Sequence, residues 1–137
     1  MPAKLKRDMD LVRSLLLEIE SGRTVFQVLS ADTAAIIGAD EVEALPADEA
    51  ARLELHLGLL ENAGFVEFRK LGGSIWHVQA ITWNGYEFLE TVRDGEVWSL
   101  VKEGAQRAGN ASLALIWELG KAMAKKVAAE RLGIVLD

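Results

Sequence analysis

The amino-acid sequence predicts an α+β fold, a winged helix-turn-helix-like domain with a two-stranded wing and a C-terminal helical extension. Residues 46–62 carry apolar residues at helical spacing, and strand-like segments follow at 65–70 and 75–81. A turn with adjacent glycines, residues 71–74, joins the two segments. Thr82 then suits the N-cap of another helix. A helix, a hairpin and a threonine-started helix in this order are typical of a winged helix.

The segment ahead of this block begins with a helix and continues less regularly. The first helix is expected from about Asp8 to Glu20, with Asp8 and Asp10 placed where the helix dipole favours anions. Residues 24–29 alternate weakly and predict a strand or an extended segment, whereas residues 33–38 fit either a short strand or a helical turn. The apolar face of the first helix consists of Leu5, Met9, Val12, Leu16 and Ile19.

The helix ahead of the wing has apolar residues on two sides. Pro46 suits its first turn, and the helix is expected to reach Asn62. A helix that is apolar on two sides packs on two sides. Its second side is therefore predicted to contact either the 24–45 segment or another chain. One stripe consists of Ala50, Leu53, Leu57 and Leu60, and the other consists of Ala51, Leu55 and Leu59.

The C-terminal extension is predicted to be helical. A break at residues 94–95 precedes another helix, and Ser112 then caps a last helix that ends near residues 132–133. Leu115 and Leu119 lie off the main apolar stripe of this last helix. Such side chains pack either within their own domain or on a second copy, and both arrangements fit the sequence.

Length and composition fit one globular domain. The chain has 137 residues, of which 50% are hydrophobic and 26% are charged, and this is enough to bury a core. We interpret residues 1–137 as a single domain, with a winged-helix-like core at about 1–93 and the extension at about 94–137. No apolar run reaches the roughly 20 residues that span a bilayer, no signal peptide is evident and cysteine is absent. These features predict a cytoplasmic protein without a membrane partner.

The sequence suggests no set of residues for catalysis, for a cofactor or for a metal. His56 lies between leucines of the two-sided helix, and His77 lies in the second wing strand, facing away from Trp76 and Val78. Both histidines are predicted to be structural, with His56 partly buried or at the surface. Their spacing fits no zinc motif, and the sequence has no phosphate-binding glycine loop or serine nucleophile elbow. We therefore predict no enzymatic activity.

Several segments together resemble a small family of bacterial and phage proteins of unknown function. They are the opening Lys6-Arg7-Asp8-Met9-Asp10-Leu11, the turn Leu59-Leu60-Glu61-Asn62-Ala63-Gly64, and the block Ile81-Thr82-Trp83-Asn84-Gly85-Tyr86-Glu87-Phe88-Leu89. The resemblance covers most of the chain and is weakest between residues 22 and 45. It implies a winged-helix-like domain found in phages, prophages and bacterial genomes, and it implies no activity or cofactor. Thr82 and Gly85 are interpreted as residues that build the strand-to-helix junction.

The polar face of the helix ahead of the wing favours a protein partner over DNA. In a winged helix this helix usually enters the major groove. Here it carries four carboxylates, and the net charge of the chain is -6, so phosphates would be repelled. We predict a non-enzymatic interaction or regulatory module of phage or prophage type, whose partner is another protein or a second copy. The predicted contacts with such a partner are Leu55, Leu59, Leu115 and Leu119.

The alternative hypothesis is a winged-helix DNA-binding transcriptional regulator. Arg52 is the one cation of the helix ahead of the wing, and Arg69 and Lys70 lie in the first wing strand. These three side chains are the predicted contacts with nucleic acid in that case.

Overall fold

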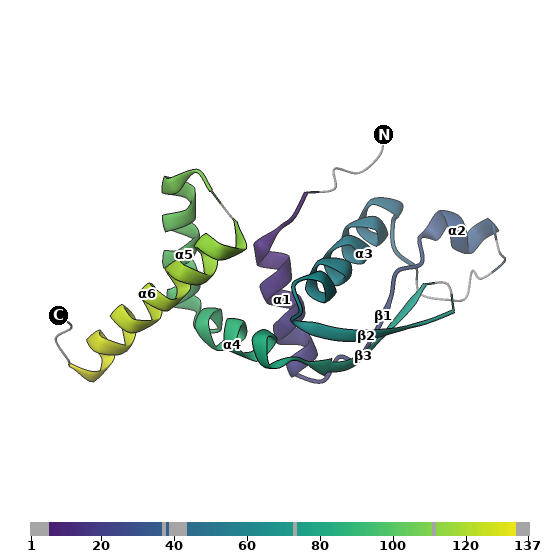
Figure 1. Cartoon of the computed structure of the whole chain (residues 1–137). Coiled ribbons are helices and arrows are strands. Elements are labelled where there is room, and N and C mark those ends of the chain that lie inside the picture. The colour runs from purple at the N-terminus through teal and green to yellow at the C-terminus, as the bar shows by residue number, and fades with distance from the viewer. Residues whose placement is uncertain (1–5, 37, 39–43, 73, 111, 134–137) are drawn as a thin grey trace. The chain divides into compact units, whose positions relative to one another are not determined.

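A three-stranded antiparallel sheet connects the helices of the N-terminal part of the chain (Figure 1). The structure is a computed structural model and describes residues 6–36, 38, 44–72, 74–110 and 112–133. Within these residues the fold is α+β, as predicted. The helices are α1 Met9–Glu20, α2 Ala31–Ile36, α3 Ala47–Asn62, α4 Trp83–Val92, α5 Gly95–Ala108 and α6 Leu113–Leu132, and the strands are β1 Val25–Gln27, β2 Val66–Leu71 and β3 Ile75–Ile81.

The chain divides into two compact units whose boundary lies inside α4, between Gly85 and Tyr86. The N-terminal unit contains the sheet with α1, α2, α3 and the first turn of α4. The C-terminal unit contains the rest of α4 with α5 and α6. The interpretation of the chain as a single domain, with a core that extends to about residue 93, stays a prediction.

The sheet of the N-terminal unit has one buried face and one open face. Strand β3 lies between β1 and β2, and Trp76 of β3 pairs with Phe26 on one side and Lys70 on the other. Phe26 and Trp76 are buried, and α1 and α3 contact this sheet (Figure 1). On the opposite face His77 pairs with Val25, whose exposed fraction is 50%. The alternation of β3 therefore follows the predicted pattern.

Helix α1 is the element that the sequence predicts most closely. The Asp8 side chain accepts a hydrogen bond from the Asp10 N–H and caps the helix, which ends at Glu20. Leu15 is also buried, although it was not assigned to the predicted face. Leu5 lies outside the described residues. The other predicted face residues are all buried, namely Met9, Val12, Leu16 and Ile19.

The segment that follows α1 resolves the two open alternatives. Strand β1 occupies part of the predicted 24–29 strand, and α2 shows that the helical alternative was the right one for the next segment. The cause is local, because the Ser30 hydroxyl accepts a hydrogen bond from the Thr33 N–H at 3.1 Å and caps α2. The sequence analysis did not use this cap.

Thr82 and Gly85 form the junction between the hairpin and α4, as predicted. The Thr82 hydroxyl accepts a hydrogen bond from the Gly85 N–H at 3.1 Å and donates one to the Gly64 carbonyl. A Cβ on Gly85 would collide with the Phe65 carbonyl oxygen and would lie 2.8 Å from a methyl carbon of Ile81. The close approach of two backbone segments therefore requires glycine at this position.

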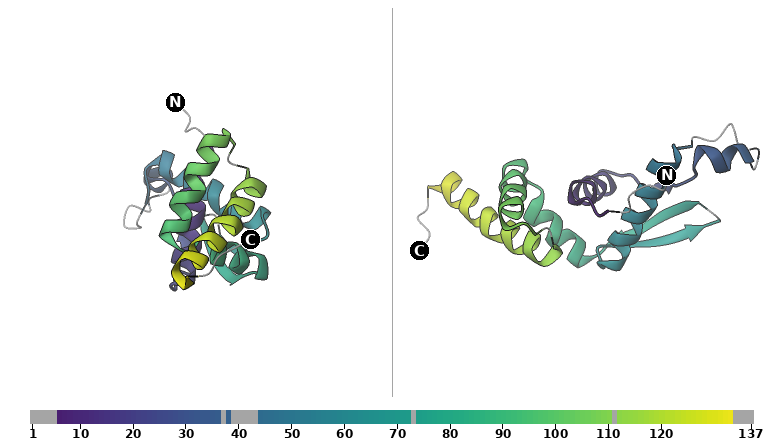
Figure 2. Two further views of the ribbon diagram at one scale, coloured as in Figure 1. Left: turned by 90° about the vertical axis from the view of Figure 1, so that its left-hand side faces the viewer. Right: turned by 90° about the horizontal axis from the view of Figure 1, so that it is seen from above.

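The C-terminal unit is helical, and α5 and α6 lie side by side (Figure 2). Asp94 caps α5 by accepting hydrogen bonds from the Glu96 and Val97 N–H groups, and Ser112 caps α6 as predicted. Helix α4 packs on α6 through an edge-on contact of Phe88 with Trp117, whose ring centroids are 5.6 Å apart. No helix in the described part of the chain is long and apolar enough to cross a membrane.

Candidate functional site

Two adjacent hollows follow α3 on the side that does not contact α1. The first has a volume of about 440 Å³ and lies between α3 and the β2–β3 hairpin. The second has a volume of about 520 Å³ and lies toward α2. Ala51 and Glu54 line both hollows, so together they form one open groove, which we call the α3 groove. Its floor and walls include Leu55, Gly58, Leu59, Lys70 and Trp76 at one end and Leu29, Ser30, Thr33 and Ser74 at the other.

The second apolar stripe of α3 lies in this groove. Leu55 and Leu59 are both half-buried, whereas Leu57 and Leu60 of the first stripe are buried in the core. One stripe of α3 therefore lies in the core and the other lines the groove, and a contact of the second stripe with another chain stays a prediction. Leu55 and Leu59 are bordered by Lys70 and Trp76 of the hairpin, whereas Ala51, at the other end of the stripe, also faces residues 28–33 of the 24–45 segment.

The three predicted nucleic-acid contacts do not converge on one surface. The guanidinium of Arg52 forms an ion pair with the carboxylate of Asp8 at the start of α1. The ammonium of Lys70 lies 4.3 Å from the centroid of the Trp76 ring, beside the α3 groove. Arg69 is exposed and pairs with His77, which places it on the opposite face of the sheet.

Carboxylates dominate the exposed surface of α3. Asp48, Glu49, Glu54 and Glu61 are all exposed, and none of them forms an ion pair with another described residue. Asp48 and Glu49 lie in the first turn, where the helix dipole stabilises them. The dipole does not account for Glu54 and Glu61, which are farther along the helix. Their side of α3 is electrostatically suited to a cationic partner.

His56 is completely buried, and the expectation of a partly buried or surface side chain was wrong. Its Nε2 atom accepts a hydrogen bond from the Asp8 N–H at 2.8 Å. Because Nε2 accepts, Nδ1 carries the proton and donates to the Arg52 carbonyl oxygen, also at 2.8 Å. Nε2 therefore joins the start of α1 to α3, and Nδ1 is bound within α3 itself. The apolar spacing of α3 gives no sign of this, because the partner is a backbone group 48 residues away.

His77 lies in β3 and contacts a neighbouring side chain of the same strand. Its Nδ1 atom lies 2.8 Å from the side-chain amide nitrogen of Gln79 on the open face of the sheet. Among the described residues, no group of three or more histidine, cysteine or carboxylate side chains could hold a metal ion.

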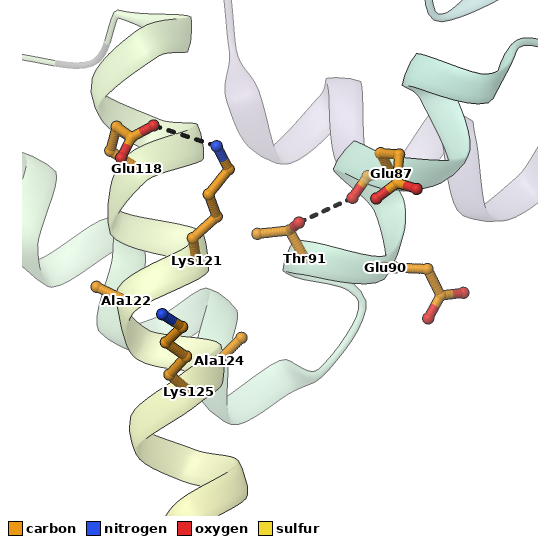
Figure 3. A pocket seen from close by; sticks show the side chains of 8 residues that line it. All are labelled: Glu87, Glu90, Thr91, Glu118, Lys121, Ala122, Ala124 and Lys125. Carbon is orange, nitrogen blue, oxygen red and sulfur yellow. Dashed lines mark hydrogen bonds and ion pairs between the residues drawn. The ribbon is translucent and has the colours of Figure 1, made fainter. Parts of the chain in front are cut away.

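A second open groove lies within the C-terminal unit, between α4 and α6 (Figure 3). Its volume is about 580 Å³, and its walls carry charges of both signs. Glu118 pairs with Lys121 at 3.3 Å on the α6 side, and Glu90 pairs with Arg93 at 2.7 Å. The Thr91 hydroxyl donates to a backbone carbonyl one turn earlier, at 2.8 Å. The Thr91 hydroxyl, which is bound to a backbone carbonyl, is therefore not placed as a nucleophile beside a base.

Leu115 and Leu119, the other predicted partner contacts, are half-buried on α6. A Cβ on Gly104 of α5 would lie 3.3 Å from both terminal methyl carbons of Leu119. Leu119 is therefore packed against α5 of its own unit. The part that either leucine plays in an oligomer stays a prediction.

Comparison with known proteins identifies relatives without an assigned activity. Residues 6–111 match a family whose description is "Hypothetical protein (DUF2513)". An uncharacterized protein of Haemophilus influenzae is 30% identical over 101 residues, which cover 72% of this chain and 76% of the relative. No solved structure matches the chain. The expected resemblance to a family of unknown function is confirmed, and the association with phages stays a prediction.

Proposed function

The chain belongs to the DUF2513 family, and we propose that it is a non-enzymatic interaction module built on a winged-helix scaffold, with a protein as its partner. The scaffold assignment is supported by the element order of the N-terminal unit, α1-β1-α2-α3-β2-β3. It is also supported by the sheet order β1-β3-β2, in which the β2–β3 hairpin takes the place of the wing. In this scheme α3 is the recognition helix.

The charge of α3 is the observation that carries the choice of a protein partner. Four exposed carboxylates have no ion-pair partner among the described residues, while the single arginine of the helix is bound to Asp8. A helix that enters the major groove faces phosphates on both sides, and unpaired carboxylates there oppose binding. The same carboxylates attract a protein surface that carries lysine or arginine.

We propose that the protein has no catalytic activity because of the hydrogen bonds of His56 and the side chains that line the α4–α6 groove. Both nitrogens of His56 are occupied by backbone groups, so this side chain has no free position for proton transfer. The polar groups that line the α4–α6 groove are exposed or bound to one another. A binding role uses these surfaces as they are, since it needs complementarity and not a reactive group.

Arg69 favours DNA binding as the second candidate function. It is exposed on the hairpin, and no described residue forms an ion pair with it. With Lys70 it gives the hairpin two cations, as a wing that tracks a phosphate backbone would need. The two side chains lie on opposite faces of β2, so only one of them can face a given backbone.

Two measurements test the proposal. The first is a gel shift of mixed-sequence duplex DNA at low salt, with wild-type protein and with the Arg69→Ala/Lys70→Ala double variant. We expect no shift for either protein. A salt-dependent shift that disappears in the double variant would show that DNA is the partner and that the proposal is wrong.

The second measurement is recovery of the tagged chain from its native host, with and without nuclease treatment. We expect a protein to be recovered in a fixed ratio in both samples. Recovery that depends on intact nucleic acid, or recovery of the chain alone as a monomer, contradicts the proposal.

A further inference from the structure

Gly58 lies inside α3, and no contact within its own chain requires a glycine at this position. Glycine in a helix interior is destabilising relative to alanine because its backbone loses more freedom on folding. Close packing explains Gly85 and Gly120, where a Cβ would lie within 3.0 Å of a neighbouring atom. At Gly58 a Cβ would meet nothing within 4 Å, apart from the helix's own backbone and chain neighbours. The space above Gly58 is therefore open and available to another molecule.

The surroundings of Gly58 are those of a docking groove. Leu55 and Leu59 flank it on the same side of α3 and remain half-buried. The hollow of about 440 Å³ at this point lies within the range of about 300–1,000 Å³ that is usual for ligand pockets. Because Gly58 has no side chain, a second backbone can approach α3 closely while apolar side chains on either side reach the leucines.

The charge on the α3 side of the groove indicates the chemistry of the occupant, since the cation on the hairpin side, Lys70, lies over the Trp76 ring. Glu54 lines both hollows, and Glu61 follows it after seven residues, which is two turns along the same side of α3. Neither carboxylate forms an ion pair with a described residue. Two lysines or arginines spaced by two helical turns would match them.

We propose that the α3 groove binds an amphipathic helix of a partner protein. Apolar residues of that helix contact Leu55 and Leu59, and its basic residues lie beside Glu54 and Glu61. This inference rests on the proposed function and specifies its partner. The helix crosses α3 at Gly58, where the two backbones come closest. Recognition follows the helix-in-groove mode, in which anchors at positions i, i+3 or i+4, and i+7 supply the contact.

The charge of α3 also argues against a second copy of the chain in this groove. An isologous contact through α3 would place the carboxylates of one copy next to those of the other, and like charges at an interface oppose association. The net charge of -6 adds to this repulsion. A basic helix from a different protein removes it.

The test is a selection of peptides that depend on the groove. Random peptides of about 16 residues, long enough for four helical turns, are displayed on phage and selected on the wild-type chain. Binders that also bind the Gly58→Gln variant are removed. Glutamine is a good helix former, and its side chain at this position occupies the open space, so the variant folds with a blocked groove. Circular dichroism confirms the fold before the selection.

The expected result is a set of peptides that combine apolar residues at helical spacing with a net positive charge. Synthetic versions should lose about tenfold or more in affinity on Gly58→Gln and on Glu54→Lys, because each change acts at the centre of the contact. Ala128→Gln is the matched control, because it adds the same side chain at an exposed position of α6 and should leave the affinity unchanged.

Other results would overturn the proposal. Selected peptides that are acidic or neutral would contradict the charge argument, and a selection without groove-dependent binders would contradict the docking argument. A dimer in light scattering that Gly58→Gln dissociates would identify a second copy as the occupant. If the groove fails in these ways while a protein is still recovered after nuclease treatment, the proposed function stands and only the position of its partner is wrong.

Discussion

Helices α3 and α6 share a sequence pattern, and the structure uses it in two different ways. Each carries leucines outside its main apolar stripe, Leu55 and Leu59 on α3 and Leu119 on α6. In the C-terminal unit Gly104 makes room for Leu119, so the extra leucine is packed by the chain itself. In the N-terminal unit Gly58 leaves room beside the leucines that the chain does not fill.

The comparison teaches that a second apolar stripe predicts a contact without predicting its partner. Periodicity gives the side of the helix and the residue types. Whether a glycine or a side chain faces that stripe depends on contacts between elements that are distant in sequence. The extra leucine of α6 is packed and the extra leucines of α3 face open space because of this one difference. Substitutions in each of the two helices can test it.

The largest expected effect concerns the inner face of α3, where the chain satisfies all the polar groups of His56. His56→Ala removes a fully buried ring and leaves the Asp8 N–H without its acceptor. We expect the free energy of unfolding to fall by about 2–4 kcal/mol, as for other buried side chains that fill space and satisfy a polar group. Urea unfolding followed by circular dichroism measures this change.

The control is His77→Ala, on the open face of the sheet, where the side chain is half-buried and contacts Gln79. The free energy of unfolding should change by no more than about 0.5 kcal/mol in this variant. Equal effects of the two substitutions would mean that His56 does not hold α1 and α3 together. The contrast between a closed inner face and an open groove face of α3 would then be lost.

His56 also shows where sequence reasoning ends. Helical spacing predicted α1, α3, α5 and α6 and the alternation of β3, because these features depend on local periodicity. The burial of His56 depends on a backbone donor at Asp8, which no local pattern identifies. The cap at Ser30 was present in the sequence and would have selected the helical alternative for α2.

The candidate site could be predicted only in part. The two stripes of α3 indicated that Leu55 and Leu59 lie on a second side of the helix, whereas the kind of partner stays a proposal. The open space at Gly58 was not predictable, since a helix-interior glycine looks the same in sequence whether or not it is packed. Gly104 and Gly58 differ only in what the fold places opposite them.

The next prediction compares glycines that the chain packs with the one that it does not. A Cβ on Gly120 would lie 2.6 Å from the Thr91 methyl carbon, so Gly120→Ala should lower the free energy of unfolding by about 1–3 kcal/mol. Gly58→Ala should instead raise it by about 0.5–1 kcal/mol, because alanine favours the helix and meets no neighbour. Thermal or urea unfolding of both variants measures the difference in sign.

The double variant Gly120→Ala/Thr91→Ser checks the cause. Serine removes the methyl group that the new Cβ would meet and keeps the hydroxyl that donates to the Glu87 carbonyl. Stability should return most of the way to that of the wild type. If Gly58→Ala destabilises the chain as much as Gly120→Ala, the space at Gly58 is not open, and the comparison between α3 and α6 fails.

The smallest expected effect concerns a carboxylate that the C-terminal unit pairs, in contrast to those of α3. The Arg131 guanidinium donates a hydrogen bond to Asp94 at 2.7 Å, and this bond is the largest cause that lowers the pKa of Asp94 from its usual 3.8. The hydrogen bond from the Val97 N–H is the next largest cause. A carboxyl group with a lowered pKa in the folded state stabilises the fold above its unfolded pKa, and this stabilisation is lost as pH falls through the folded value. Asp94→Asn keeps an oxygen for the cap and removes the charge.

We therefore expect Asp94→Asn to lower the midpoint of urea unfolding slightly at pH 7, with the difference from wild type disappearing well below pH 3.8. The effect is small because solvent reaches both partners, with 56% of the Arg131 side chain and 35% of the Asp94 side chain exposed. Glu54→Gln is the control on α3, where the carboxylate has no ion-pair partner among the described residues, and it should leave the midpoint at pH 7 unchanged. A loss of stability on Glu54→Gln equal to that on Asp94→Asn would show that Glu54 already serves its own fold. The carboxylate of Glu54 would then no longer support the proposal that a basic helix of another protein binds beside it.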